Sequence, residues 1–223
     1  MWLIIDKPVG FSSFQVVAAV RKKTGVKKVG HAGTLDPFAS GVLVVAVGRE
    51  FTRLIDTVQS AEKEYLVRLV FGIETETFDP EGKITAIDTK ISTNSDVAQF
   101  ISDPSFQNRI LHEFIGNINQ FPPRFSAKKI NGVPMYSLAR AQKDFEVKPN
   151  RVTISELRIV RVRNTSFPSL DLYVRCGKGT YIRSLVRDLA RKLNTVAFAQ
   201  LLVRTRVGNY RIGDAITLEQ LCG

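Results

Sequence analysis

Apolar residues along the chain fall into several runs that have the spacing and length of β-strands. Residues 41–47 form a continuous run that is rich in valine, and residues 65–71 place alternate side chains on two faces, as a strand does. Residues 3–5, 152–163 and 170–175 have a similar composition. We therefore expect a strand in each of these segments, with 41–47 and 65–71 in the core.

Three other segments carry the start signals of helices. Ser12-Ser13 precedes an apolar run that ends near Gly25, so we expect a helix between them with a serine as its N-cap. A polar stretch is expected to cap a short helix over residues 96–102. Pro134 lacks an N–H and suits the first turn of a helix, which we expect to end near Lys143.

The clearest helix follows the sequence Gly177-Lys178-Gly179, where Thr180 is the expected N-cap. Five apolar residues then recur at helical spacing and form one stripe: Ile182, Leu185, Val186, Leu189 and Leu193. Arginines at four-residue steps lie on another face: Arg183, Arg187 and Arg191.

The order of these elements predicts the fold class. Asp79-Pro80-Glu81-Gly82 has proline at the second and glycine at the fourth position, which is typical of a type I turn between two strands. Strands and helices are mixed without a regular βαβ alternation. The pattern therefore predicts an α+β fold with a mixed, largely antiparallel sheet flanked by helices and loops.

The composition is that of a folded cytoplasmic protein. Of the 223 residues, 44% are hydrophobic, which is enough for a sizeable core. No apolar run is long enough to cross a bilayer, and the N-terminus lacks the basic flank and length of a signal peptide. We therefore expect a cytoplasmic protein that makes no contact with a membrane.

The formal net charge of +11 is distributed unevenly. Residues 1–123 contain 13 Lys and Arg against 14 Asp and Glu, whereas residues 124–223 contain 19 against 7. A one-sided basic excess of this size is typical of proteins that bind a polyanion. We interpret it as a surface for nucleic acid rather than for a membrane.

Cysteine and histidine are scarce. Cys176 and Cys222 do not lie in a C-x-x-C motif, and His31 is far along the chain from His112. These spacings do not fit a zinc site or a disulfide framework. We therefore expect reduced cysteines and no metal, which excludes the zinc-dependent deaminases of nucleic acids.

The densest cluster of chemical groups is the segment Gly30-His31-Ala32-Gly33-Thr34-Leu35-Asp36-Pro37. It lies between an expected helix and an expected core strand, and loops in such places often present side chains for function. An isolated Asp-Pro pair would more simply brace a turn. The motifs around it favour a functional interpretation.

This segment, with Lys28-Val29 before it and Ala39-Ser40-Gly41-Val42-Leu43 after it, resembles the signature loop of the TruB-type pseudouridine synthases. Further motifs match the same family in the same order and extend the resemblance over nearly the whole chain: Asp6-Lys7-Pro8-x-Gly10-x-Ser12-Ser13, Lys63-x-Tyr65, Pro122-Pro123-x-x-Ser126-Ala127-x-Lys129, Tyr136-x-x-Ala139-Arg140 and Lys178-Gly179-Thr180-Tyr181-Ile182-Arg183.

The resemblance implies an enzyme that isomerises one uridine of tRNA, at position 55 in the T-loop, to pseudouridine. The glycosidic bond to N1 breaks, the uracil rotates while it is held, and a bond forms to C5. The resemblance implies no metal and no organic cofactor. We also expect no guide RNA, because the stretch Asn131-Gly132-Val133-Pro134-Met135-Tyr136 is typical of the bacterial members. The resemblance also implies a single catalytic domain over residues 1–223, for which a monomer is our default expectation.

The resemblance assigns roles to particular side chains. Asp36 is the expected nucleophile or base that starts the reaction, since an aspartate is ionised at neutral pH. Arg183 is expected to pair with Asp36 and to keep it ionised and aimed. Tyr65 is expected to stack on the uracil that is taken out of the tRNA loop.

Three more residues match positions that contact the RNA in this family. Tyr181 and Leu202 are expected to line the pocket of the target base, and His31 is expected to help hold the RNA loop open. Contacts to the tRNA backbone, which position the RNA rather than specify its sequence, are expected from basic residues of the second half. The candidates are Arg124, Lys128, Lys129, Arg187, Arg191, Arg204 and Arg206.

The chain ends at Gly223, about where the catalytic domain of this family ends, so we expect it to lack the C-terminal RNA-binding domain that is common in the family. Two alternatives remain. One is an RNA-binding or tRNA-folding module whose role does not need catalysis, and the other is a guide-RNA-dependent relative. The presence of Asp36, Tyr65 and Arg183 favours the enzyme over the binding module.

Overall fold

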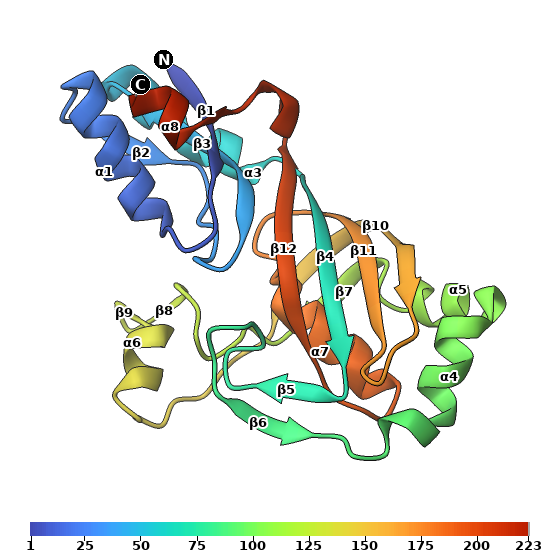
Figure 1. The fold of residues 1–223 in the computed structure, drawn as a ribbon. Helices are drawn as coiled ribbons and strands as arrows, with labels where there is room; N and C mark the ends of the chain where they lie inside the picture. Colours follow the sequence, from blue (N-terminus) through green and yellow to red (C-terminus); the bar gives the residue numbers. More distant parts are fainter. Residues whose placement is uncertain (223) are drawn as a thin grey trace.

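The computed structural model describes residues 1–222 except for the side chain of Cys222. Within these residues the protein is built around a ten-stranded sheet (Figure 1). Its main strands run across the sheet in the order β14 (Ile216–Thr217), β1 (Trp2–Lys7), β3 (Ser40–Val47), β12 (Ala197–Val207), β4 (Lys63–Phe71), β11 (Ser169–Cys176), β10 (Asn150–Arg163) and β7 (Gly116–Gln120). Strand β2 (Val29–His31) is added beside β3, and β13 (Tyr210–Arg211) beside β12.

Most neighbouring strands are antiparallel, and the pairs β1–β14 and β3–β12 are parallel. Two short hairpins lie outside this sheet: β5 (Ile73–Thr75) with β6 (Ile84–Ile87), and β8 (Lys129–Ile130) with β9 (Val133–Pro134). The arrangement confirms the predicted α+β class and the largely antiparallel sheet.

The helices are α1 (Ser13–Thr24), α2 (Arg49–Thr52), α3 (Ile55–Ser60), α4 (Ser95–Ser102), α5 (Pro104–His112), α6 (Met135–Arg140), α7 (Ile182–Lys192) and α8 (Leu218–Cys222), with short 3-10 turns at Ile91–Thr93 and Ile212–Asp214. In the part of the chain that the structure describes, no helix has the length and apolar character needed to span a membrane.

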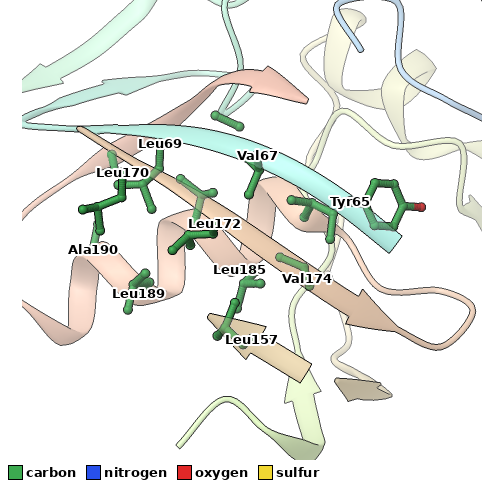
Figure 2. Close-up of a cluster of buried hydrophobic side chains, with 14 of the residues drawn as sticks. Tyr65, Val67, Leu69, Leu157, Leu170, Leu172, Val174, Leu185, Leu189 and Ala190 are labelled. Carbon is green, nitrogen blue, oxygen red and sulfur yellow. The ribbon is translucent and has the colours of Figure 1, made fainter. Parts of the chain in front are cut away.

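The larger core lies between α7 and the strands β4, β11 and β12. Figure 2 shows side chains from β4 and β11 meeting the apolar stripe of α7, with the ring of Tyr65 at the end of the cluster and its hydroxyl pointing away from it. The alternation predicted for residues 65–71 is confirmed, since Val67, Leu69 and Phe71 are buried on the same face. The core thus fixes the strand that carries Tyr65.

A second core holds α1 against β1, β2 and β3. Val16, Val17 and Val20 of α1 pack on this side, and the helix begins at a capping box in which Ser12 and Gln15 satisfy each other's backbone N–H. At the other end, Gly25 takes the left-handed conformation at φ 68°. The predicted helix and both of its ends are confirmed.

Two local predictions differ from the structure. Helix α6 ends at Arg140 rather than near Lys143, and Gln142 has a positive φ of 51°, which interrupts the helix. The N-cap of α7 is Tyr181 rather than Thr180. The hydroxyl of Thr180 instead donates to the carbonyl of Gly177 at 3.0 Å, so it is engaged in the preceding turn.

Candidate active site

Asp36 lies in the loop between β2 and β3, and buried side chains hold the backbone of this loop in place. The hydroxyl of Ser13 donates to the carbonyl of Leu35 at 3.1 Å and accepts from its N–H at 2.9 Å. The ammonium of Lys7, which is fully buried, donates to the carbonyls of Pro37, Pro8 and Phe11. The loop backbone is therefore held on both sides of Asp36.

Arg204 of β12 holds the same loop further toward its start. Its guanidinium donates to the carbonyls of Gly33, Thr34 and Val42 at 3.1, 3.3 and 2.7 Å, and the residue is 1% exposed. The prediction that Arg204 belongs to an RNA-binding surface is therefore wrong. Arg204 lies two residues after the buried Leu202 with no irregularity of β12 between them, so both side chains point inward.

Arg187 is the second predicted surface residue that the structure places inside. It is 7% exposed, lies over the ring of Phe78, and donates to the carbonyl of Phe121 at 3.1 Å. Lys129, Arg124 and Arg191 are exposed, as predicted. Arg206 is partly buried and pairs with Glu64 at 2.7 Å; Lys128 is also partly buried.

The side chains of Asp36 and Arg183 form a two-point ion pair. The Nε of Arg183 lies 2.9 Å from Oδ2 of Asp36, and Nη2 lies 3.2 Å from Oδ1. The arginine side chain is 5% exposed, whereas the aspartate side chain is 33% exposed. The structure confirms the predicted contact between the two side chains. Of the two, the aspartate is the one that remains accessible.

The remaining donors of Arg183 are also used. Nη1 donates to the carbonyl of Thr77 at 2.8 Å and lies 3.1 Å from a carboxylate oxygen of Asp79, and Nη2 donates to the carbonyl of Phe125 at 3.0 Å. A guanidinium has five N–H groups in a fixed plane, so this set orients it fully. Three loops that are distant in sequence are thereby joined at one side chain.

Asp79 is buried and faces Arg183 from the β5–β6 hairpin. Its carboxylate also accepts hydrogen bonds from the hydroxyl of Thr77 and the N–H of Glu81. Burial raises the pKa of Asp79, and the nearby Arg183 opposes that shift. The sequence predicted a turn at Asp79, and the hairpin confirms it, but the ion pair was not foreseen because no local pattern encodes it.

A pocket of about 400 Å³ opens beside this ion pair. Its lining brings together five of the residues singled out in the sequence: Asp36, Tyr65, Tyr181, Arg183 and Leu202. Lys63, Lys128 and Lys178 also line it. The pocket thus combines one accessible carboxylate, two aromatic rings and a cationic rim.

Tyr181 is held in the pocket wall by the side-chain amide of Gln120. The amide oxygen accepts from the N–H of Tyr181 at 2.8 Å, and the amide nitrogen donates to its carbonyl at 3.1 Å. The hydroxyl of Ser184 anchors the adjacent loop by donating to the carbonyl of Phe121 at 2.8 Å. The start of α7 and the loop after β7 are therefore fixed together.

His31 lies at the end of β2, outside the residues that line the pocket. It is half-buried, and its Nδ1 has no hydrogen-bond partner among the described residues. Burial lowers the pKa of His31, and the charge of Arg204 lowers it further. The structure therefore does not bring His31 together with the other predicted site residues.

Two buried lysines near the pocket have strongly shifted pKa values. Burial lowers the pKa of Lys7 to about 8 against the opposing attraction of Asp36, and burial lowers the pKa of Lys63 to about 8 with help from Arg204. Lys63 donates to the carbonyls of Gln59 and Ala61, which fixes the turn before β4. Both ammonium groups are thus occupied with backbone oxygens.

The arrangement suits chemistry that starts from an accessible carboxylate, beside aromatic rings on which a flat ring can stack. Asp36 is aimed by a rigid guanidinium, and Tyr65 offers a ring whose environment excludes water: burial raises the pKa of its hydroxyl. Within residues 1–222, no group of three or more His, Cys, Asp or Glu side chains could hold a metal ion.

The sequence is similar to those of known proteins. The model of the TruB family pseudouridylate synthase (N terminal domain) matches residues 21–182. The tRNA pseudouridine synthase B of Chlamydia abortus (strain DSM 27085 / S26/3) is 39% identical over 214 residues, which cover 96% of this chain and 85% of that protein. The tRNA pseudouridine synthase B of Syntrophotalea carbinolica is 41% identical over 219 residues, 98% of this chain and 67% of that protein.

Solved structures share the fold. A chain of the crystal structure of a Cbf5-Nop10-Gar1 complex has a TM-score of 0.67 at 26% identity, and one of an archaeal box H/ACA sRNP Nop10-Cbf5 complex has 0.65 at 23%. The matches cover 98% and 99% of this chain and 52% of each solved chain, so the chain spans about half their length. From the family match and the identity to these relatives, we conclude that the chain belongs to the TruB family of pseudouridylate synthases.

Proposed function

We propose that the protein converts a uridine of tRNA to pseudouridine, at position 55 in the T-loop, with Asp36 as the residue that starts the reaction. The carboxylate of Asp36, aimed by Arg183 at the wall of a pocket that also contains Tyr65, is the observation that carries this proposal. The relatives named above are tRNA pseudouridine synthases, which supports tRNA as the substrate.

The reaction is an isomerisation, so its atoms balance without a co-reactant. The C1′–N1 bond breaks and a C1′–C5 bond forms. The proton at C5 is lost, and N1 gains one. In the pocket, Tyr65 and Tyr181 would hold the freed uracil by stacking and packing while it rotates, and Asp36 would act on the ribose or on a proton.

We further propose that residues 1–223 act as one catalytic unit, as a cytoplasmic monomer and without a guide RNA. The basic excess of residues 124–223 would supply contacts to the RNA backbone, with exposed Lys129, Arg124 and Arg191 among them. Each phosphate contact releases counterions, so binding should weaken steeply with salt.

The test is incubation of the purified protein with an unmodified tRNA transcript, followed by base-specific mapping of pseudouridine. Product at the T-loop uridine, in the absence of any guide RNA, is the expected result. A transcript with cytidine at that position is the matched control and should give no product. Product at other uridines only, or binding of tRNA with no product, would contradict the proposal.

A further inference from the structure

Two phenylalanine side chains are exposed beside the loop that carries Asp36 and have no role in the site described above. Phe11 in the β1–α1 loop is 43% exposed, and Phe14 at the start of α1 is 67% exposed. Val16, Val17 and Val20 bury the opposite side of this helix. The two rings are therefore displayed to solvent. We call Phe11 and Phe14 the aromatic platform.

The platform is fixed relative to Asp36. The ammonium of Lys7 donates to the carbonyl of Phe11 at 2.6 Å and to the carbonyl of Pro37, the residue after Asp36, at 3.3 Å. The N–H of Gly10 also donates to the carbonyl of Pro37 at 2.8 Å. Figure 1 shows the β1–α1 loop and the loop before β3 at the same edge of the part of the molecule that β1, β3 and α1 form. The backbone of the β1–α1 loop, which carries Phe11, therefore adjoins the loop that carries Asp36.

The charges beyond the platform favour a polyanion as its occupant. The guanidinium of Arg21 lies 6.0 Å from the centroid of the Phe14 ring. Arg21 also lines a second pocket of about 500 Å³ with Lys28, Arg49 and Arg53, and no acidic side chain lines it. Aromatic rings beside cations form the surfaces on which unpaired nucleotides stack. An apolar protein segment carries no negative charge that could pair with these cations.

We propose that Phe11 and Phe14 stack on unpaired bases of the RNA that flank the target uridine when that uridine enters the pocket. This inference rests on the proposed function, because it takes the target to lie in a single-stranded loop. Stacking is tolerant of sequence, so the platform holds the opened loop in place without selecting a particular base. It contributes to binding in the ground state and the transition state alike.

The experiment uses the full chain and T-arm hairpin RNAs in which 2-aminopurine replaces one unpaired base next to the target uridine. Phe11→Leu and Phe14→Leu keep an apolar side chain but remove the flat ring. Phe167→Leu is the control, because Phe167 is also exposed, at 37%. It precedes β11 and so lies at one end of the β4–β11 pair, whereas Lys63 and Cys176 pair at the other end. Fluorescence on binding and steady-state kinetics on the unlabelled hairpin are both measured.

Stacking predicts that each platform variant raises KM at least about fivefold with an unchanged kcat. The quenching of 2-aminopurine at one flanking position should be lost in the same variant, and Phe167→Leu should behave as the native protein does. Native KM and native quenching in both platform variants would overturn the inference. A native protein that binds the hairpin but forms no pseudouridine would overturn the proposed function instead, and the fluorescence would still decide the stacking.

Discussion

Arg183 reaches Asp36 across 147 residues of sequence and contacts both of its carboxylate oxygens, at 2.9 and 3.2 Å. A two-point contact from a rigid guanidinium fixes both the position and the orientation of the carboxylate. The arginine is enclosed by protein and the aspartate faces the pocket. In the proposed reaction Arg183 would act through Asp36, so any change that loosens the arginine should reduce catalysis.

Asp79 is the second carboxylate on Arg183, and its removal should loosen that arginine. We expect Asp79→Asn to lower the free energy of unfolding by about 1–3 kcal/mol, because a buried charge-assisted bond is lost. We also expect kcat to fall roughly tenfold or more, since Asp36 is then less well aimed. Denaturant unfolding and single-turnover kinetics measure the two effects.

Asp171→Asn is the control for this prediction. Asp171 also pairs with two arginines, Arg68 and Arg163, but it lies on β11 among partly exposed residues that do not line the pocket. Its replacement should reduce stability and leave kcat unchanged. Equal losses of kcat in both variants would show that the effect of Asp79 is one of global stability.

Ser13 and Ser12 are adjacent serines with different contacts. Replacing each in turn distinguishes the effect of holding the Asp36 loop from the effect of capping α1. Ser13→Ala removes both hydrogen bonds to Leu35 and should cost about 1–2 kcal/mol of stability together with a loss of kcat. Ser12→Ala removes the N-cap of α1 and should cost about 0.5–2 kcal/mol with kcat unchanged. The contrast in kcat at similar melting temperatures is the test, and a similar kcat in the two variants would contradict it.

The lowered pKa of Lys7 predicts that the pH profile of kcat has a descending alkaline limb. Above about pH 8 the neutral amine has too few N–H groups to donate to three carbonyls, so the loop that carries Asp36 should loosen and kcat should fall. Between pH 8 and 10.5 the unfolded chain binds more protons than the folded chain, so this group adds to stability as the pH rises.

Activity and stability should therefore change in opposite directions over that range, which distinguishes the effect from alkaline unfolding. Lys63, with a pKa also lowered to about 8, should contribute to the same limb. The limb should move to higher pH in Lys7→Arg, which stays charged. A pH profile of kcat that is identical in the native protein and in Lys7→Arg would refute the assignment to Lys7.

At acid pH, Asp171 should be a source of instability. Burial alone would raise the pKa of Asp171, but hydrogen bonds and charge from Arg163 and Arg68 lower it to about 2. A lowered carboxylate pKa gives stability that is complete above about pH 4 and is lost as the pH falls toward 2. Urea unfolding measured between pH 2 and 5 should show a weaker pH dependence in Asp171→Asn. An unchanged slope would contradict the assignment.

The sequence predicted those parts of the fold that rest on local patterns. The alternation in β4, the capping box of α1 and the apolar stripe of α7 each have a physical period or a fixed spacing, and each prediction is confirmed. The pairing of Asp36 with Arg183 came from the family resemblance, because nothing local links two residues on separate elements.

The features that sequence reasoning missed are long-range or depend on irregular strands. Arg204 follows Leu202 at strand spacing, so its inward direction could have been inferred from the burial of Leu202. The irregularities on either side of that pair hide the alternation along the rest of β12. Asp79 and Ser13 contact the site through tertiary packing, which the local sequence does not specify.

In the proposed reaction, Asp36 starts the isomerisation and the chain acts alone. Loss of the C5 hydrogen provides a direct readout, because tRNA transcript labelled with tritium at C5 of its uridines releases the label as pseudouridine forms. The native protein is predicted to release the label of one uridine per tRNA, and Asp36→Asn is predicted to bind the transcript with unchanged affinity and to release none. Release by Asp36→Asn at the native rate would contradict the account.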